Sequence, residues 1–155
     1  MSPPERAAAE AMARDLVAGC VGLRVDRLHR AVARIHEGAL ARIGLSLAQT
    51  EILGIVVGHG RPLPPSAVAS ALTMERSTVS RTLAGMTTAG WIEAVELTPT
   101  GRTRLVGVTP LGLQVLASAR GAWEGAQTRV LERLGPEALD VLDRWLAALV
   151  DPMPP

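Results

Sequence analysis

A run of side chains rich in hydrogen-bond donors lies near the middle of the 155-residue chain, in the segment Arg76-Ser77-Thr78-Val79-Ser80-Arg81. Every cation in the sequence is an arginine, and its planar, forked guanidinium can donate two hydrogen bonds to one phosphate or to one guanine edge. Ser77 and Thr78 fall where a helix is expected to begin, and the free N–H groups and the dipole at such an end favour a phosphate. The segment therefore predicts DNA contacts from Arg76, Ser77, Thr78, Ser80 and Arg81.

A second pair of arginines, Arg102 and Arg104, follows the turn signal Thr98-Pro99-Thr100-Gly101. If this turn is the tip of a β-ribbon, both guanidinium groups lie just beyond the tip. In that position they can meet a phosphate or a narrow minor groove. Arg102 and Arg104 complete the set of residues predicted to bind DNA.

These residues also have a plainer interpretation. Serine and threonine at a helix start often serve only as caps, and arginines on an amphipathic helix often form a solvated face. Residues 62–109 carry four arginines against Glu75, Glu93 and Glu96, and the whole chain has 16 basic and 15 acidic residues. Because the region is only weakly basic, its charge does not decide between the two interpretations. The order of the structural elements has to decide between them.

The surrounding elements are predicted to be two short helices and a β-hairpin. A helix over residues 66–72 and a second over 77–89, closed by Gly90, flank a turn at residues 73–76. Residues 91–97 and 105–108 have the composition of strands, and the turn signal between them predicts a hairpin. This order is typical of a winged helix-turn-helix, in which the second helix enters the major groove and the ribbon reaches the flanking backbone or minor groove.

Longer helices are predicted on both sides of this region. Apolar residues recur near the helical period over residues 7–43, which predicts one long helix. Such a helix is poorly stable unless its apolar stripe is buried, either against a second subunit or against the rest of its own chain. Further helices are predicted over residues 46–57, where Ser46 and Gln49 have the form of a capping box, from Thr109-Pro110 to Leu134, and over residues 137–149.

The sequence thus predicts a mainly α-helical fold with a small β-hairpin wing, a winged helix-turn-helix with N- and C-terminal dimerisation helices. The expected division is an N-terminal dimerisation helix over residues 1–44, a DNA-binding region over 45–109, and C-terminal dimerisation helices with a tail over 110–155.

Several short motifs in this order resemble the MarR (multiple antibiotic resistance) family of regulators. They are Val68-Ala69-Ser70-Ala71-Leu72, the run from Arg76 to Leu83, Gly90-Trp91-Ile92, and the later positions Arg102, Val106, Val108-Thr109 and Gly112. The resemblance implies an obligate homodimer that binds a pseudo-palindromic operator on double-stranded DNA, usually as a repressor. It also implies that an unidentified small-molecule effector, or oxidation of a cysteine, releases the DNA.

Three positions depart from the pattern of that family. The family commonly has an aspartate two residues before the wing arginine, where this chain has Thr100, so Arg102 lacks the partner that would orient it. Thr73 stands where the turn between the two helices usually has glycine, and Pro64 occupies the usual capping position of the first helix, so that Ser66 caps it or the helix starts elsewhere.

The alternative function, suggested by Thr100 and the weak basicity, is a winged-helix protein–protein interaction module without specific DNA binding.

Other side chains that can do chemistry give weaker signals. Cys20 lies in the predicted first helix, where the resemblance implies the reactive thiol of the organic-hydroperoxide sensors, but those sensors hold the thiolate with tyrosines and this chain has none. We expect Cys20 to be a small buried hydrophobe. His29 and His36 share a helix face, yet two histidines do not make a zinc site. Neither a metal nor a cofactor is expected.

The three tryptophans are expected to serve packing. Trp91 is expected between the wing and a helix, and Trp123 and Trp145 are expected in the dimer core.

The remaining function classes are disfavoured. The sequence shows no glycine-rich phosphate loop, nucleophile elbow or cysteine pair with metal spacing, so we expect no enzymatic activity. No apolar run approaches the roughly 20 residues of a membrane span, the first residues lack the layout of a signal peptide, and a single cysteine suits a reducing compartment. We therefore expect a cytoplasmic protein.

Overall fold

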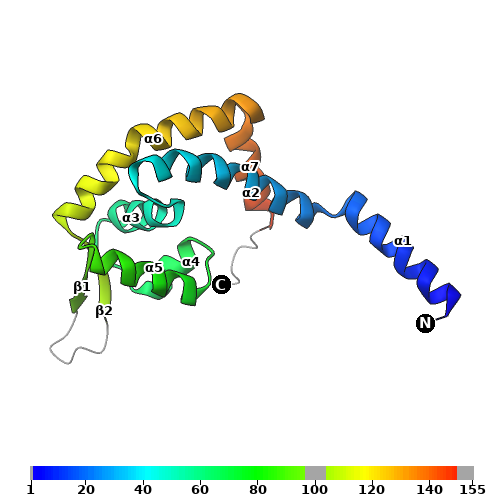
Figure 1. Ribbon diagram of the computed structural model, residues 1–155, viewed down its shortest axis with the longest axis horizontal. Helices are drawn as coiled ribbons and strands as arrows, with labels where there is room; N and C mark the ends of the chain where they lie inside the picture. The colour runs from blue at the N-terminus through cyan, green and yellow to red at the C-terminus, as the bar shows by residue number, and fades with distance from the viewer. Residues whose placement is uncertain (1, 97–103, 150–155) are drawn as a thin grey trace. The chain divides into compact units, whose positions relative to one another are not determined.

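The computed structural model describes residues 2–96 and 104–149, and these form two compact units that divide between Ile35 and His36. The described residues contain the helices α1 to α7 and a two-stranded antiparallel hairpin (Figure 1). The predicted fold class, mainly α-helical with a β-hairpin wing, is confirmed.

The first unit consists of α1 (Pro3–Gly19) and the larger part of α2 (Val21–Leu40). The prediction of one helix over 7–43 is wrong here, because the chain is extended at Cys20, with φ −67° and ψ 118°. Glycines at positions 19 and 22 weaken the helix at this point. The Arg24 guanidinium donates hydrogen bonds to the carbonyl oxygens of Ala18 and Cys20 and so satisfies acceptors at the break. Cys20 is a half-buried residue between two helices, and not a buried residue within one.

The second unit begins with the end of α2 and a short 3₁₀ turn, Ala41–Ile43, before α3 (Leu47–His59). The capping box predicted for α3 is confirmed. The Gln49 N–H donates to the Ser46 hydroxyl at 3.1 Å, and the Ser46 N–H donates to the Gln49 side chain at 2.9 Å. This box satisfies two of the donors that a helix start leaves without helical partners.

Two short helices follow, α4 (Pro65–Ala71) and α5 (Arg76–Thr88). Because α4 starts before Ser66, with Pro64 as its N-cap, Ser66 does not cap this helix. Pro65 at the first position has no N–H and a backbone φ suited to a helix, so the start needs fewer capping acceptors.

The wing is formed by β1 (Ile92–Glu96) and β2 (Arg104–Val108), which pair antiparallel from Ile92 opposite Val108 to Glu96 opposite Arg104. The chain before α4 adds one bridge to this ribbon. The Leu63 N–H donates to the Val106 carbonyl at 3.1 Å, and the Val106 N–H donates to the Leu63 carbonyl at 2.7 Å. The predicted hairpin is confirmed over these strands, and its predicted turn, residues 98–101, lies outside the described residues.

Two more helices complete the unit, α6 (Pro110–Leu134) and α7 (Ala138–Leu149), with Gly135 at the break between them. The hydrophobic core of the unit joins the helix-turn-helix, the ribbon and α3. Each of these elements contributes buried side chains, which are Ile52, Leu53, Val56, Leu63, Val68, Ala69, Val79, Leu83, Met86, Ile92 and Val106. Trp91 packs against this core and against a second cluster around Leu40, Leu45 and Ala119, so its predicted packing role is confirmed.

One threonine joins the end of the helix-turn-helix to the start of α6. The Thr109 hydroxyl donates to the Gly90 carbonyl at 2.6 Å and accepts from the Gly112 N–H at 3.1 Å. The Thr109 N–H also donates to the Trp91 carbonyl at 3.1 Å. The same side chain therefore caps α6, as predicted, and holds that helix against the residues that follow α5.

Gly112 makes the close approach at this junction possible. A Cβ atom at position 112 would lie 2.0 Å from the Trp91 carbonyl oxygen and 2.8 Å from Cγ1 of Val108, both far inside van der Waals contact. Only glycine fits there without displacing backbone.

Among the described residues, no single helix combines the length and apolarity that a membrane span requires, although the bent pair Val21–Ile43 and Leu47–His59 meets both criteria when taken together.

We predict that Gly112→Ala lowers the free energy of unfolding by about 3 kcal/mol, because the new methyl group must push α6 away from Trp91. The matched control is Gly121→Ala on the same helix, where a Cβ meets nothing within 4 Å. That change is expected to raise stability by up to about 1 kcal/mol through helix propensity. Urea unfolding followed by circular dichroism measures both variants. Equal stabilities for the two would contradict the close approach.

Candidate nucleic-acid interface

The turn between α4 and α5 depends on one residue with left-handed backbone. Thr73 has φ 52°, the conformation that glycine adopts most readily. The turn is closed by two hydrogen bonds, from the Thr73 N–H to the Ser70 carbonyl at 3.1 Å and from the Met74 N–H to the Ala69 carbonyl at 3.0 Å. The geometry explains why glycine suits this position and shows that the threonine here adopts the same conformation at an energetic cost.

α5 begins at Arg76, one residue earlier than predicted, with Glu75 as its N-cap. The Glu75 side chain makes no cap hydrogen bond. The donors of the first turn, around Arg76 and Ser77, are therefore not occupied by this carboxylate, and both of these residues are exposed.

α5 has a buried face and an exposed face. Val79, Leu83 and Met86 are buried at helical spacing and fix the helix against the core. The opposite face is exposed and carries Ser77, Arg81, Ala84 and Thr88, with Arg76 and Ser80 beside it. Thr78 is half-buried on the other flank. The structure thus brings four of the five residues predicted on this helix, Arg76, Ser77, Ser80 and Arg81, onto the exposed side.

Backbone carbonyls of α5 hold several of its polar side chains. Nε of Arg81 donates to the Ser77 carbonyl at 3.3 Å, which lays the guanidinium along the exposed face. The hydroxyls of Thr82, Thr87 and Thr88 each donate to the carbonyl four residues earlier, at 3.0, 2.9 and 3.1 Å. These threonine hydroxyls are therefore engaged within the helix.

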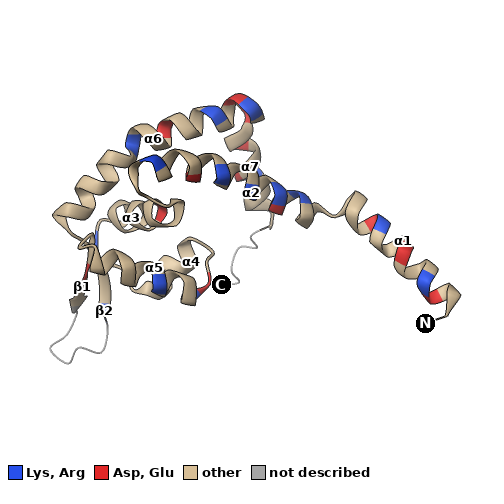
Figure 2. Cartoon of the chain, in the orientation of Figure 1, with Lys and Arg blue, Asp and Glu red and all other residues tan. Residues whose placement is uncertain are grey.

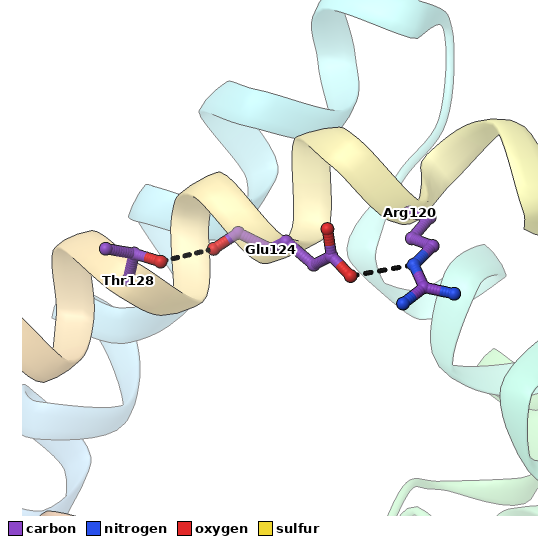
Figure 3. A network of polar contacts seen from close by, with 3 residues as sticks. All are labelled: Arg120, Glu124 and Thr128. Carbon is purple, nitrogen blue, oxygen red and sulfur yellow. Dashed lines mark hydrogen bonds and ion pairs between the residues drawn. The ribbon is translucent and has the colours of Figure 1, made fainter.

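α5 carries a net positive charge. Arg76 and Arg81 are its basic residues and its sequence contains no acid (Figure 2). Within the part of the chain that the structure describes, neither arginine forms an ion pair. Arg120 on α6 differs, since its Nε donates to the Glu124 carboxylate at 2.7 Å, while the Thr128 hydroxyl donates to the Glu124 carbonyl (Figure 3). Arg76 and Arg81 thus remain available to an anionic partner.

The wing arginines are placed only in part. Arg104 is exposed at the first residue of β2, opposite Glu96 in the strand register. Arg102 and Thr100 lie outside the described residues, so the prediction of a wing contact by Arg102 stays a prediction.

Sequence reasoning did not select Ala84 and Thr88, which share the exposed face of α5 with Ser77 and Arg81. The helical period would have found them, because the spacings of four, three and four residues from Ser77 run along one face.

The two histidines that were not expected to bind a metal differ in exposure. His29 is exposed, whereas His36, two turns further along α2, is buried. No group of three or more His, Cys, Asp or Glu residues suited to a metal occurs among the described residues.

Residues 43–103, which include α3 to α5 and β1, match the model of the MarR family. The helix-turn-helix segment of the chain is thus a MarR-family segment. No curated protein sequence matches it significantly. The resemblance stated from the sequence motifs is therefore confirmed.

Proteins from E. coli, Rhodococcus jostii RHA1 and M. tuberculosis have solved structures with a similar fold. A mutant of E. coli MarR complexed with operator DNA has 16% sequence identity and a TM-score of 0.75, and the match covers 88% of this chain and 97% of that one. CouR from Rhodococcus jostii RHA1, bound to p-coumaroyl-CoA, has 16% identity and a TM-score of 0.73, with 89% and 96% covered. MosR from M. tuberculosis has 24% identity and a TM-score of 0.70, with 84% and 96% covered. At these identities the likeness establishes the winged-helix fold of this chain.

We predict that Thr73→Gly raises the free energy of unfolding by about 1 kcal/mol, because it removes the cost of a β-branched residue with positive φ. Ser70→Gly, three residues earlier inside α4, is the control and should lower stability by about 0.5–1 kcal/mol. Thermal and urea unfolding measure both. A loss of stability in Thr73→Gly would show that the left-handed turn is wrong.

Proposed function

We propose that the protein is a dimeric, sequence-specific DNA-binding transcriptional regulator that acts as a ligand-responsive repressor. The observation that carries the proposal is the exposed face of α5, where Arg76, Ser77, Ser80 and Arg81 stand on a helix without acidic residues. This face lies within the segment that matches the MarR family.

The dimensions of α5 suit the major groove. Its 13 residues span about 20 Å, and the groove of B-DNA, about 12 Å wide, admits one helix. The buried side chains of α5 hold the helix against the core, so that its outer face is presented as a rigid surface. Arginine and serine side chains with the N–H groups of the first turn supply donors for phosphates and base edges.

Dimerisation is supported by apolar faces that the single chain leaves exposed. In α7 the side chains of Leu139, Trp145, Leu146 and Leu149 lie on one side of the helix, and they are 50%, 53%, 60% and 82% exposed. In the first unit, α1 has no buried residue, and Leu16, Val17, Val21 and Val25 are exposed. Helices of this kind are stable when a partner covers the apolar side, and a second copy of the chain fits a pseudo-palindromic operator.

The proposed release of DNA by a small molecule is supported by a structure of similar fold. CouR, which shares the fold, was solved with p-coumaroyl-CoA. We propose that an effector shifts this chain between DNA-binding and released conformations through its different affinity for the two.

We predict that the purified protein binds a duplex from its own upstream region more tightly than bulk DNA, with an affinity that falls steeply as salt rises. Arg81→Ala should weaken this binding by about 1–3 kcal/mol if the guanidinium contacts a base. Fluorescence anisotropy measures both. Arg129→Ala is the matched control, because Arg129 is also exposed and its Nε also donates to the carbonyl four residues earlier, on α6.

Two outcomes would contradict this part of the proposal. Equal effects of Arg81→Ala and Arg129→Ala would mean that α5 holds no special contact. Binding without preference for any sequence would favour the interaction-module alternative.

We predict that Leu146→Glu makes the protein monomeric at micromolar concentration, because it places a charge on the apolar side of α7. Ala147→Glu, on the polar side of the same helix, should leave the dimer intact. Sedimentation velocity distinguishes the two states. A monomeric wild-type protein would refute the dimer outright.

A further inference from the structure

The exposed face of α5 changes its chemistry along the helix. The first turns expose donors, from Arg76, Ser77, Ser80 and Arg81. The last turns expose Ala84 and Thr88 at the centre of the same face. A helix lying in the major groove would therefore present donors to one part of a half-site and small carbon groups to the next.

The hydroxyl of Thr88 does not add a donor to that second part. It donates to the Ala84 carbonyl at 3.1 Å, four residues back along the helix. A threonine that makes this bond has its χ1 angle restricted, and its methyl group takes the other branch of the Cβ atom. Ala84 and Thr88 thus both offer a methyl group to whatever lies against the face.

The hydrogen bond of Arg81 to the backbone leaves its guanidinium suited to guanine. Its Nε donates to the Ser77 carbonyl at 3.3 Å, so the two terminal nitrogens Nη1 and Nη2 remain for a partner. Two parallel N–H groups match O6 and N7 of guanine in the major groove.

The other bases lack their usual readers on this helix. Adenine is typically bound by asparagine or glutamine, and cytosine by an acidic side chain. The sequence of α5 has none of these residues. The methyl group of thymine, in contrast, is recognised by apolar contact with alanine or with a threonine methyl.

We propose that α5 selects a half-site in which a guanine, bound by Arg81, is followed by thymines whose 5-methyl groups contact Ala84 and the Thr88 methyl. This inference rests on the proposed DNA-binding function. Along the helix axis Ala84 lies about 4.5 Å and Thr88 about 10.5 Å beyond Arg81, given a rise of about 1.5 Å per residue. The thymines should therefore lie roughly one and three base pairs from the guanine, at about 3.4 Å per base pair.

The test replaces thymine by deoxyuridine, which removes only the 5-methyl group. A duplex that the wild-type protein prefers over bulk DNA is first selected from a random pool, and each thymine of one half-site is then replaced in turn. We expect deoxyuridine to weaken binding about three- to fivefold at the two positions roughly one and three base pairs from the essential guanine, and to have no effect elsewhere.

Protein variants assign each methyl contact. Thr88→Ser keeps the hydroxyl and its hydrogen bond but removes the methyl, so it should weaken binding by a similar factor and make the protein insensitive to deoxyuridine at one position. Thr88→Val keeps the methyl and loses the hydroxyl, so it should bind as the wild type does. Ala84→Gly should remove the sensitivity at the other position. The matched control is Thr87→Ser, which loses a methyl on the flank of the helix and keeps the same type of hydrogen bond, to Leu83.

The possible outcomes distinguish a wrong assignment of the bases from a wrong assignment of the DNA-binding function. A protein that prefers a particular duplex but tolerates deoxyuridine at every position, or in which Thr88→Ser and Thr87→Ser behave alike, would overturn the base assignment alone. A protein that prefers no duplex from the pool would overturn the proposed DNA-binding function and the base assignment with it.

Discussion

The position of α6 relative to the end of α5 depends on the hydrogen bonds of Thr109. This one side chain caps α6 and, through the Gly90 carbonyl, ties that helix to the chain leaving α5. Trp91 adds contacts to two hydrophobic clusters, and Gly112 allows α6 to approach the Trp91 carbonyl closely. The end of α5, the base of the wing and the start of α6 therefore behave as one joint. Thr109 thereby links the start of α6 directly to the end of α5.

The opposite end of α5 is fixed by different physics. Thr73 adopts a left-handed conformation in a turn closed by two backbone hydrogen bonds, and the next residue, Met74, packs against the core. Buried residues then orient α5 over its length. These contacts hold α5 in one orientation against the core. Preorganisation of this kind lowers the entropy lost on binding, which matters for a surface with only two arginines on its helix.

Much of the fold could be predicted from local signals. The capping box of Ser46 and Gln49, the glycine after α5 and the Thr109-Pro110 start of α6 each act over a few residues, so they are visible in the sequence. The break at Cys20 was missed, because glycines at 19 and 22 and the reach of Arg24 interrupt a pattern that is otherwise periodic. Gly112 was noted as part of a motif, but the reason for it, a carbonyl contributed by a residue 21 positions earlier, is a tertiary contact.

In the candidate site, too, some features could be predicted from local sequence signals and others depend on tertiary contacts. The donors of α5 could be selected by residue type, but which of them face outward depends on the register of Val79, Leu83 and Met86 against the core. That register places Thr78 on the flank and brings Ala84 and Thr88 to the centre. Residue type alone selects arginine and serine as candidates for DNA contact, but not alanine. The place of Ala84 on the exposed face could therefore be recognised only from the orientation of α5 in the structure.

Hydroxyl-radical footprinting of the upstream DNA with the purified wild-type protein, together with the stoichiometry of the complex, tests the proposed dimeric DNA binding most directly. We expect two chains per site and two protected half-sites centred one helical turn apart, about 34–36 Å along the duplex. A single protected half-site bound by one chain, or uniform protection without a defined site, would contradict it.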